Sequence, residues 1–154
     1  MDVKLVNPFI ASFNHVMKSL GFIDILTRGI AVKSGATKCN GVVLVVGLVG
    51  DLKGTIVFSM QEEVALRIAS KLMMGAPVAE LDEMARSSIC ELSNMLSAHA
   101  ATGLTEQGHA VDISPPNIMQ GDNMRITMAS EKTISIEVSA DGLILQMNIA
   151  IGRE

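Results

Sequence analysis

The chain has 154 residues, 49% of them hydrophobic and 18% charged, which suits one ordinary domain with its own hydrophobic core. The formal net charge is -4 and no cluster of Lys or Arg stands out, so a nucleic-acid partner is not expected. No apolar run approaches the roughly 20 residues that span a bilayer. Residues 1–20 also lack the basic start and continuous apolar stretch of a signal peptide. We therefore expect one cytoplasmic domain, residues 1–154, with no membrane contact.

The sulfur-containing residues give little functional information. Cys39 and Cys90 are far apart and belong to no CxxC motif, so free thiols are expected. The chain has 11 Met and neither Trp nor Tyr, which indicates a core or interface filled by flexible thioethers and aliphatic side chains.

The first predicted element is an amphipathic helix near the N-terminus. Asn7 is the expected N-cap, Pro8 the first helical residue and Gly21 the end of the helix. Apolar residues then recur at helical spacing: Phe9, Ile10, Phe13, Val16, Met17 and Leu20.

The pattern of residues 29–59 changes to that of strands. β-branched runs at 42–46 and 55–58 are separated by glycines, which predicts a hairpin around Gly50-Asp51. Another strand is expected near residues 30–33.

Two helices are predicted to follow. Ser59-Met60-Gln61-Glu62 fits a capping box, and the helix after it should end at Gly75. Its expected buried residues are Ala65, Ile68, Ala69, Leu72 and Met73. The second helix runs from about residue 81 to 107 and ends at Gly108, a length of roughly 40 Å.

The C-terminal third reads as strands again. Residues 124–128, 134–138 and 143–149 alternate or concentrate apolar side chains, and Asp141-Gly142 is a strong type I′ turn signal. We expect a three-stranded antiparallel meander here. Helices and strands do not alternate strictly, so an α+β fold with an antiparallel sheet is favoured over a doubly wound one.

The long helix has two distinct sides on a helical wheel. Its apolar stripe should face the core: Ala85, Ile89, Leu92, Leu96 and Gly103, with His99 and Ala100 at its edges. The opposite ridge carries Ser87, Glu91 and Asn94, and Ala98 and Ala101 continue it. The alanines would let another protein's backbone approach closely. Polar residues on a helix are equally what any solvated face contains, and spacing alone does not separate the two interpretations.

Other catalytic patterns are missing from the sequence. Ser, His and Asp show no triad spacing, and there is no nucleophile elbow or Walker-type phosphate loop. His15, His99 and His109 form no metal-ligand cluster in the sequence, so no metal site is expected on the chain. His99 is expected to be a packed, hydrogen-bonded histidine, and Cys90 a passive thiol.

The string Ser87-Ser88-Ile89-Cys90-Glu91-Leu92-Ser93-Asn94, with Pro115-Pro116 some two dozen residues later, resembles the signature of the CheC/CheX/FliY family of chemotaxis phosphatases. Larger members carry the Glu and Asn motif twice, whereas the first helix here has no matching Glu, so the chain is most similar to the CheX-like members. The segments 6–10 and 54–59 also resemble that family, and the similarity covers essentially the whole chain.

The resemblance implies a function and a role for two residues. Family members hydrolyse the aspartyl phosphate of the response regulator CheY, so the implied partner is a phosphorylated CheY-like receiver domain. Asn94 would position the attacking water, because a carboxamide both accepts and donates without adding negative charge. Glu91 would pair with the active-site Lys of the receiver, and Ser87 would support the docking surface. No cofactor is expected on this chain, since the receiver supplies Mg²⁺.

Two further readings remain open. The chain could instead be a receiver-binding or flagellar-switch-like module without catalysis, which would have no reason to keep both Glu91 and Asn94. A structural dimerisation domain is a third reading. A homodimer formed through sheet association is expected in any case, because the family forms such dimers and the apolar terminal strand at 143–151 should not be left as an open edge.

Overall fold

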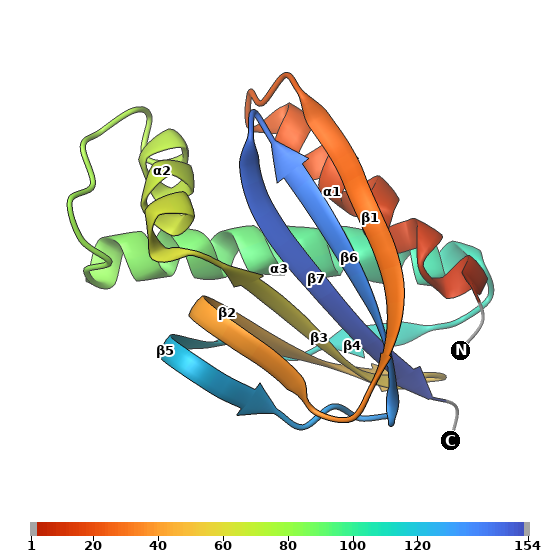
Figure 1. Cartoon of the computed structure of the whole chain (residues 1–154). Helices are drawn as coiled ribbons and strands as arrows, with labels where there is room; N and C mark the ends of the chain where they lie inside the picture. Colours follow the sequence, from red (N-terminus) through yellow and green to blue (C-terminus); the bar gives the residue numbers. More distant parts are fainter. Residues whose placement is uncertain (1–2, 153–154) are drawn as a thin grey trace.

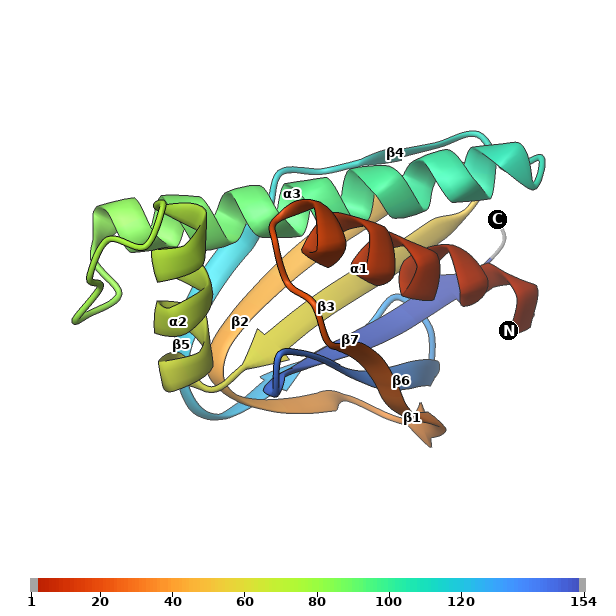
Figure 2. The ribbon, with the colours of Figure 1, turned by 90° about the horizontal axis from the view of Figure 1, so that it is seen from above.

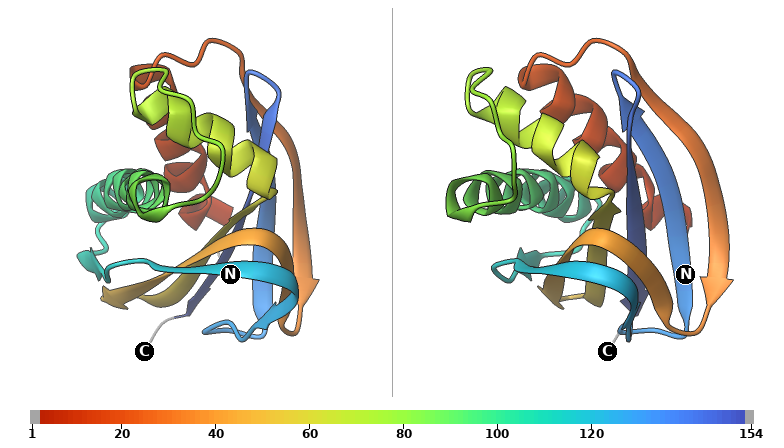
Figure 3. Two further views of the ribbon diagram at one scale, coloured as in Figure 1. Left: turned by 90° about the vertical axis from the view of Figure 1, so that its left-hand side faces the viewer. Right: turned by 60° about the vertical axis from the view of Figure 1, so that its left-hand side comes forward.

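Three α-helices lie on one side of a seven-stranded antiparallel sheet in the computed structural model of the chain, which describes residues 3–152 (Figures 1 and 3). The predicted α+β class is confirmed. The helical elements are the short 3-10 helix Val3–Leu5, α1 (Asn7–Ser19), α2 (Glu62–Leu72) and α3 (Glu83–Glu106). The strands are β1 (Ile25–Ser34), β2 (Thr37–Gly50), β3 (Lys53–Met60), β4 (Val111–Ile113), β5 (Asn117–Ile126), β6 (Lys132–Ala140) and β7 (Leu143–Gly152).

The order of the strands in the sheet is β1-β6-β7-β3-β2-β4, and β5 also pairs with β2. The predicted hairpins β2–β3 and β6–β7 are confirmed. The predicted C-terminal meander is wrong, because β5 pairs with β2 and not with β6. Alternating side chains mark β5 as a strand, but its partner depends on which apolar surface it covers. Met119 and Met124 of β5 pack against a small cluster that includes Val43 and Val57.

Two predicted helix starts are wrong in detail. Asn7 is the first residue of α1, and Val6 holds the N-cap position with no side-chain cap, because the 3-10 helix runs directly into α1. Ser59 is the penultimate residue of β3, so it cannot cap α2. Gln61 occupies that N-cap position, and its side chain makes no capping hydrogen bond.

The main core lies between the sheet and the helices. Phe9, Phe13 and Met17 of α1 are fully buried there, together with Ile68 of α2. Seen from above, α1 and α3 both run over the sheet, and α2 stands at one end of it (Figure 2). Alternate residues of the central strands point into this core and the others toward the opposite, outer face of the sheet.

The β6–β7 turn has the predicted geometry and fastens the start of β1. Asp141 and Gly142 both have positive φ, 49° and 82°, as a type I′ turn requires. The Asp141 carboxylate accepts hydrogen bonds from the N–H groups of Asp24 (2.8 Å) and Ile23 (3.1 Å). These bonds hold the pKa of Asp141 below its usual range, the Asp24 bond most strongly.

β1 is one edge of the sheet, and β4 and β5, which both pair with β2, form the other. β7 lies between β6 and β3, so the apolar strand at residues 143–151 is paired on both sides within the chain and offers no edge to a second copy. β1 pairs with β6 alone and is exposed along most of its length. Within residues 3–152, no helix is both long enough and apolar enough to cross a membrane.

Candidate functional site

The long helix α3 is held rigidly along its whole length. Its N-terminus is capped by Asp82, whose carboxylate accepts from the Ala85 N–H at 2.9 Å. Its apolar stripe is buried as predicted, and Leu104 extends it: Ala85, Ile89, Leu92, Leu96, Ala100 and Leu104 are at most 2% exposed. A surface built on such a helix keeps its geometry better than one built on a loop.

α1 crosses α3 and fixes its C-terminal half. The Ser12 hydroxyl, which is buried, donates to the Leu96 carbonyl. Further along, Gly103 faces Pro8 so closely that an added Cβ would lie 2.9 Å from the Pro8 Cβ. Gly103 is therefore a packing requirement, which explains a glycine inside a helix.

The solvent side of α3 carries the predicted ridge. Ser87, Glu91 and Ala98 are exposed, and Asn94 and Ala101 are half-buried. The structure thus places all five predicted site residues on one surface of one helix. Glu91 and Asn94 are one turn apart, and neither side chain makes a hydrogen bond or an ion pair with another described residue. A carboxylate and a carboxamide are therefore both available to a partner.

Sequence reasoning did not single out Met84, which extends this surface. It lies in the first turn of α3 and is 67% exposed, in a shallow depression lined also by Asp82, Glu83 and Ser87. On the helical wheel Met84 points in nearly the same direction as Glu91, seven residues on. The sequence contained a signal for this residue, because Met84 is an apolar residue that falls outside the apolar stripe of the helical wheel.

Cys90, next to Glu91, is a free, half-buried thiol. Burial raises its pKa, and the nearby Arg86 only partly opposes that effect. A thiol with a raised pKa carries little thiolate, which agrees with the passive role predicted for it.

The two prolines of the motif lie in the link between β4 and β5. This link is tied to β2 by a reciprocal pair of hydrogen bonds: the Gly47 N–H donates to the Ser114 hydroxyl at 2.7 Å, and the Ser114 N–H donates to the Gly47 carbonyl at 2.9 Å. Pro115 and Pro116 follow this anchor directly.

The histidines only partly match their prediction. The rings of His15 and His99 stack with centroids 4.6 Å apart, which joins α1 to α3. His99 is packed as expected, but the predicted hydrogen bond is wrong, because its buried Nδ1 has no partner among the described residues. In the part of the chain that the structure describes, no three His, Cys, Asp or Glu side chains are grouped to hold a metal ion.

Comparison with known proteins identifies the family. The family model described as chemotaxis phosphatase CheX matches residues 42–139, which include all of α3. The chain belongs to the CheX family. A CheX relative from Thermotoga maritima, described as CheY-P phosphatase CheX, is 32% identical over 126 residues, which cover 82% of this chain and 81% of that protein.

Solved structures agree with the CheX assignment. A CheC-like superfamily protein from Shewanella sp. PV-4 has a TM-score of 0.85 at 26% identity, with 99% of both chains covered. A chain of the CheX-CheY-BeF3-Mg²⁺ complex from Borrelia burgdorferi has a TM-score of 0.76 at 30% identity, with 97% of both chains covered. The CheC-like fold expected from the motif is therefore confirmed.

Proposed function

We propose that this CheX-family chain dephosphorylates the aspartyl phosphate of a CheY-like receiver domain, with Glu91 and Asn94 of α3 as its working side chains. Family membership supports the reaction, since the Thermotoga maritima relative is named a CheY-P phosphatase. The Borrelia burgdorferi complex, which contains CheX and CheY, supports the choice of partner.

The single observation that carries the site assignment is the unpartnered pair itself. Glu91 and Asn94 stand one turn apart on a capped and well-packed helix, and within the described residues nothing in the fold uses their polar atoms. Exposed polar groups on a rigid support, next to small residues such as Ala98, suit insertion into another protein's active site.

In the proposed reaction Asn94 holds one water molecule in line with the phosphorus. The water oxygen forms a new bond to phosphorus as the P–O bond to the receiver's aspartate breaks, and the electron pair leaves with the carboxylate. An acyl phosphate needs no nucleophile from this chain, so correct placement of the water is the main contribution. A carboxamide can accept a hydrogen bond from that water or donate one to it without repelling the phosphoryl group.

Glu91 has a different role, because its negative charge would oppose a phosphoryl dianion. We assign it to an ion pair with the receiver's active-site Lys, which fixes the register of α3 in the complex. Mg²⁺ is assigned to the phosphorylated receiver, and the CheX-CheY complex from Borrelia burgdorferi also contains Mg²⁺. Ser87, Ala98, Ala101 and Met84 are assigned to the contact surface around the pair.

The alternative is a module that binds the receiver without hydrolysing its phosphate. The two proposals differ in turnover. A receiver labelled with radioactive phosphate, in tenfold molar excess over this protein and in Mg²⁺, should lose its label completely and faster than it does alone. Binding without faster loss would support the scaffold and reject the phosphatase.

We further propose a cytoplasmic homodimer formed through β1. This edge strand carries the exposed apolar residues Leu26 (48%), Ile30 (57%) and Val32 (68%). An exposed apolar edge is normally covered or paired, and a second copy offers the same edge in the antiparallel direction around a two-fold axis.

A further inference from the structure

A cavity of about 680 Å³ lies on the outer side of the sheet, away from the surface of α3 that carries Glu91 and Asn94. Its walls are the β1–β2 turn region (residues 33–40, which include the end of β1 and the start of β2), the end of β3 with the start of α2, and the outer face of β6 and β7. Gln146 and Asn148 of β7 point into it, because their neighbours Leu145, Met147 and Ile149 point into the main core. Its volume falls within the range of small-molecule sites.

The topology of the sheet creates this space. β1 and β2 are consecutive in the chain, yet three strands, β6, β7 and β3, separate them in the sheet. The link between them therefore passes in front of the outer face, as the turn from β1 into β2 in Figure 1 shows. It carries Lys33 and Lys38, both exposed at the rim of the cavity.

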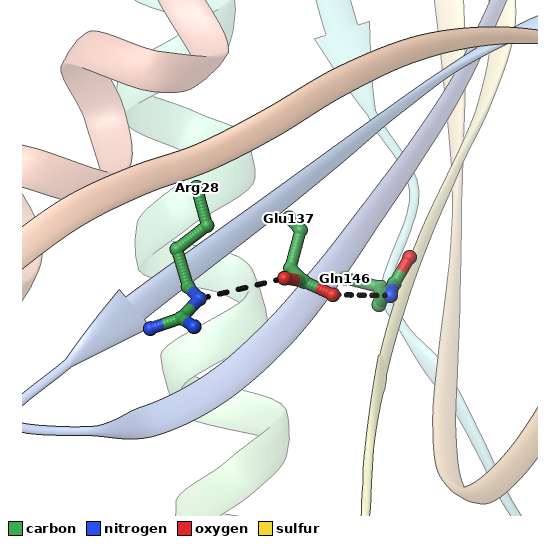
Figure 4. A network of polar contacts seen from close by, with 3 residues as sticks. All are labelled: Arg28, Glu137 and Gln146. Atoms are coloured by element: carbon green, nitrogen blue, oxygen red, sulfur yellow. Dashed lines mark hydrogen bonds and ion pairs between the residues drawn. The ribbon is translucent and has the colours of Figure 1, made fainter.

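The one carboxylate in the wall is already neutralised. Glu137 forms an ion pair with Arg28 at 3.5 Å and accepts a hydrogen bond from Gln146 at 3.1 Å (Figure 4). Gln146 accepts in turn from the Ser135 hydroxyl at 3.3 Å. With Glu137 compensated in this way, the two lysines make the rim electropositive.

Asn148 is a polar side chain without a partner. It is 4% exposed, and its carboxamide makes no hydrogen bond with any other described residue. Its polar atoms are open to the cavity, so they are available to a molecule bound there. Ser135, Gln146 and Glu137 nearby bond to one another, and Asn148 does not take part in their network.

The start of α2 forms the opposite wall, through Gln61 and Val64. The first N–H groups of a helix lack partners within the helix, and here the Gln61 side chain makes no capping hydrogen bond. The backbone donors of such an N-terminus favour phosphate oxygens, although Glu62 and Glu63 of the same turn oppose an anion by their charge. The start of α2, the two lysines and Asn148 therefore line one cavity.

We propose that this cavity binds a small organic phosphate. The phosphate group lies at the start of α2 near Lys33 and Lys38, and a hydroxylated body reaches Asn148, which both donates to it and accepts from it. The site is separate from the Glu91 and Asn94 ridge and does not depend on the phosphatase activity.

NMR titration of the ¹⁵N-labelled full chain tests this proposal. Ribose 5-phosphate and AMP are the probes, with ribose and inorganic phosphate as the partial ligands. At least one probe should cause saturable shifts in the Asn148 side-chain amide and the backbone amides of residues 61–64. That probe should bind at least about tenfold more tightly than either partial ligand. K38Q should weaken its binding about tenfold, whereas K18Q, a matched change on α1, should not.

Two results would overturn the proposal. If inorganic phosphate binds as tightly as both probes, the cavity holds an adventitious ion only. If neither probe causes saturable shifts, the cavity is filled by water alone.

N148S, which keeps a small polar side chain, should weaken the binding of the probe without the loss of stability that a large apolar replacement risks.

Discussion

Pro8 of α1 lies against Gly103 of α3, so closely that any side chain at position 103 would press on the proline ring. The ring is rigid and belongs to the first turn of α1, so it cannot yield as a flexible side chain would. The contact sets how near the two helices approach. Along α3, Gly103 lies about two turns beyond Leu96, whose carbonyl accepts from Ser12, and about two and a half turns beyond Asn94.

G103A should destabilise the protein despite alanine's higher helix propensity. The propensity gain is about 1 kcal/mol, whereas overpacking of a tight contact costs about 1–3 kcal/mol. We expect a net loss of about 1 kcal/mol in the free energy of unfolding, measured by urea titration. T102A, at the adjacent exposed position, should change it by less than about 0.5 kcal/mol. A G103A variant more stable than wild type would show that the helices can separate at no cost.

E91Q should weaken the complex with the receiver more than it affects the fold. Loss of one charge-assisted contact predicts roughly a tenfold higher Kd, or about 1.4 kcal/mol. Calorimetry with a BeF3-treated receiver in Mg²⁺ measures the two Kd values. The difference between wild type and E91Q should shrink as salt is added, because salt screens the ion pair that only wild type makes. E106Q, an exposed glutamate at the far end of α3, is the control. Equal effects of E91Q and E106Q on the Kd would show that Glu91 contributes only general negative charge and forms no specific ion pair.

D141N should remove a pH-dependent part of the stability. The folded pKa of Asp141 is lowered by hydrogen bonds from Asp24 and Ile23, so its contribution is present above the unfolded pKa of about 3.9 and is lost as the pH falls through the folded value. Asn also tolerates positive φ, so backbone strain stays matched. Urea titrations should show wild type more stable than D141N at pH 7, with the difference narrowing below pH 4. A constant difference would mean that the carboxylate charge plays no part.

I30K should break the proposed dimer. Ile30 is 57% exposed on the edge strand β1, and a lysine there would place like charges near each other across a two-fold axis. Light scattering after size exclusion should give a monomer mass for I30K. V49K, at an equally exposed apolar position on β2, should leave the dimer intact. A dimeric I30K with a monomeric V49K would move the interface to the other end of the sheet.

Much of the fold could be predicted from local patterns. The pattern of apolar residues located α1, α2, α3 and, at least in part, the six longer strands, and Asp141-Gly142 predicted its turn from the need for positive φ. The exposed side of α3 also followed from the helical wheel, which placed Glu91 and Asn94 together.

The errors concern contacts between distant segments. β5 pairs with β2 because Met119 and Met124 cover Val43 and Val57, a choice that depends on the shape of the folded sheet. β4 is too short for its pattern to be recognised. Ser59 resembled a cap, but the ladder to β2 continues through Met60 and keeps it in a strand. The outer cavity has no sequence signature, because Asn148 and Lys38 are far apart in the chain and only the order of the strands in the sheet brings them to one cavity.

The decay of a phosphorylated CheY-like receiver in Mg²⁺, followed with wild type and with N94A, tests the central claim most directly. Wild type should accelerate the decay, and N94A should reduce the acceleration by about a hundredfold, while it still binds the BeF3-treated receiver. Removal of Mg²⁺ should abolish the acceleration. An N94A variant that binds the receiver and accelerates its dephosphorylation as well as wild type does would contradict the assignment of Asn94 as the residue that positions the water.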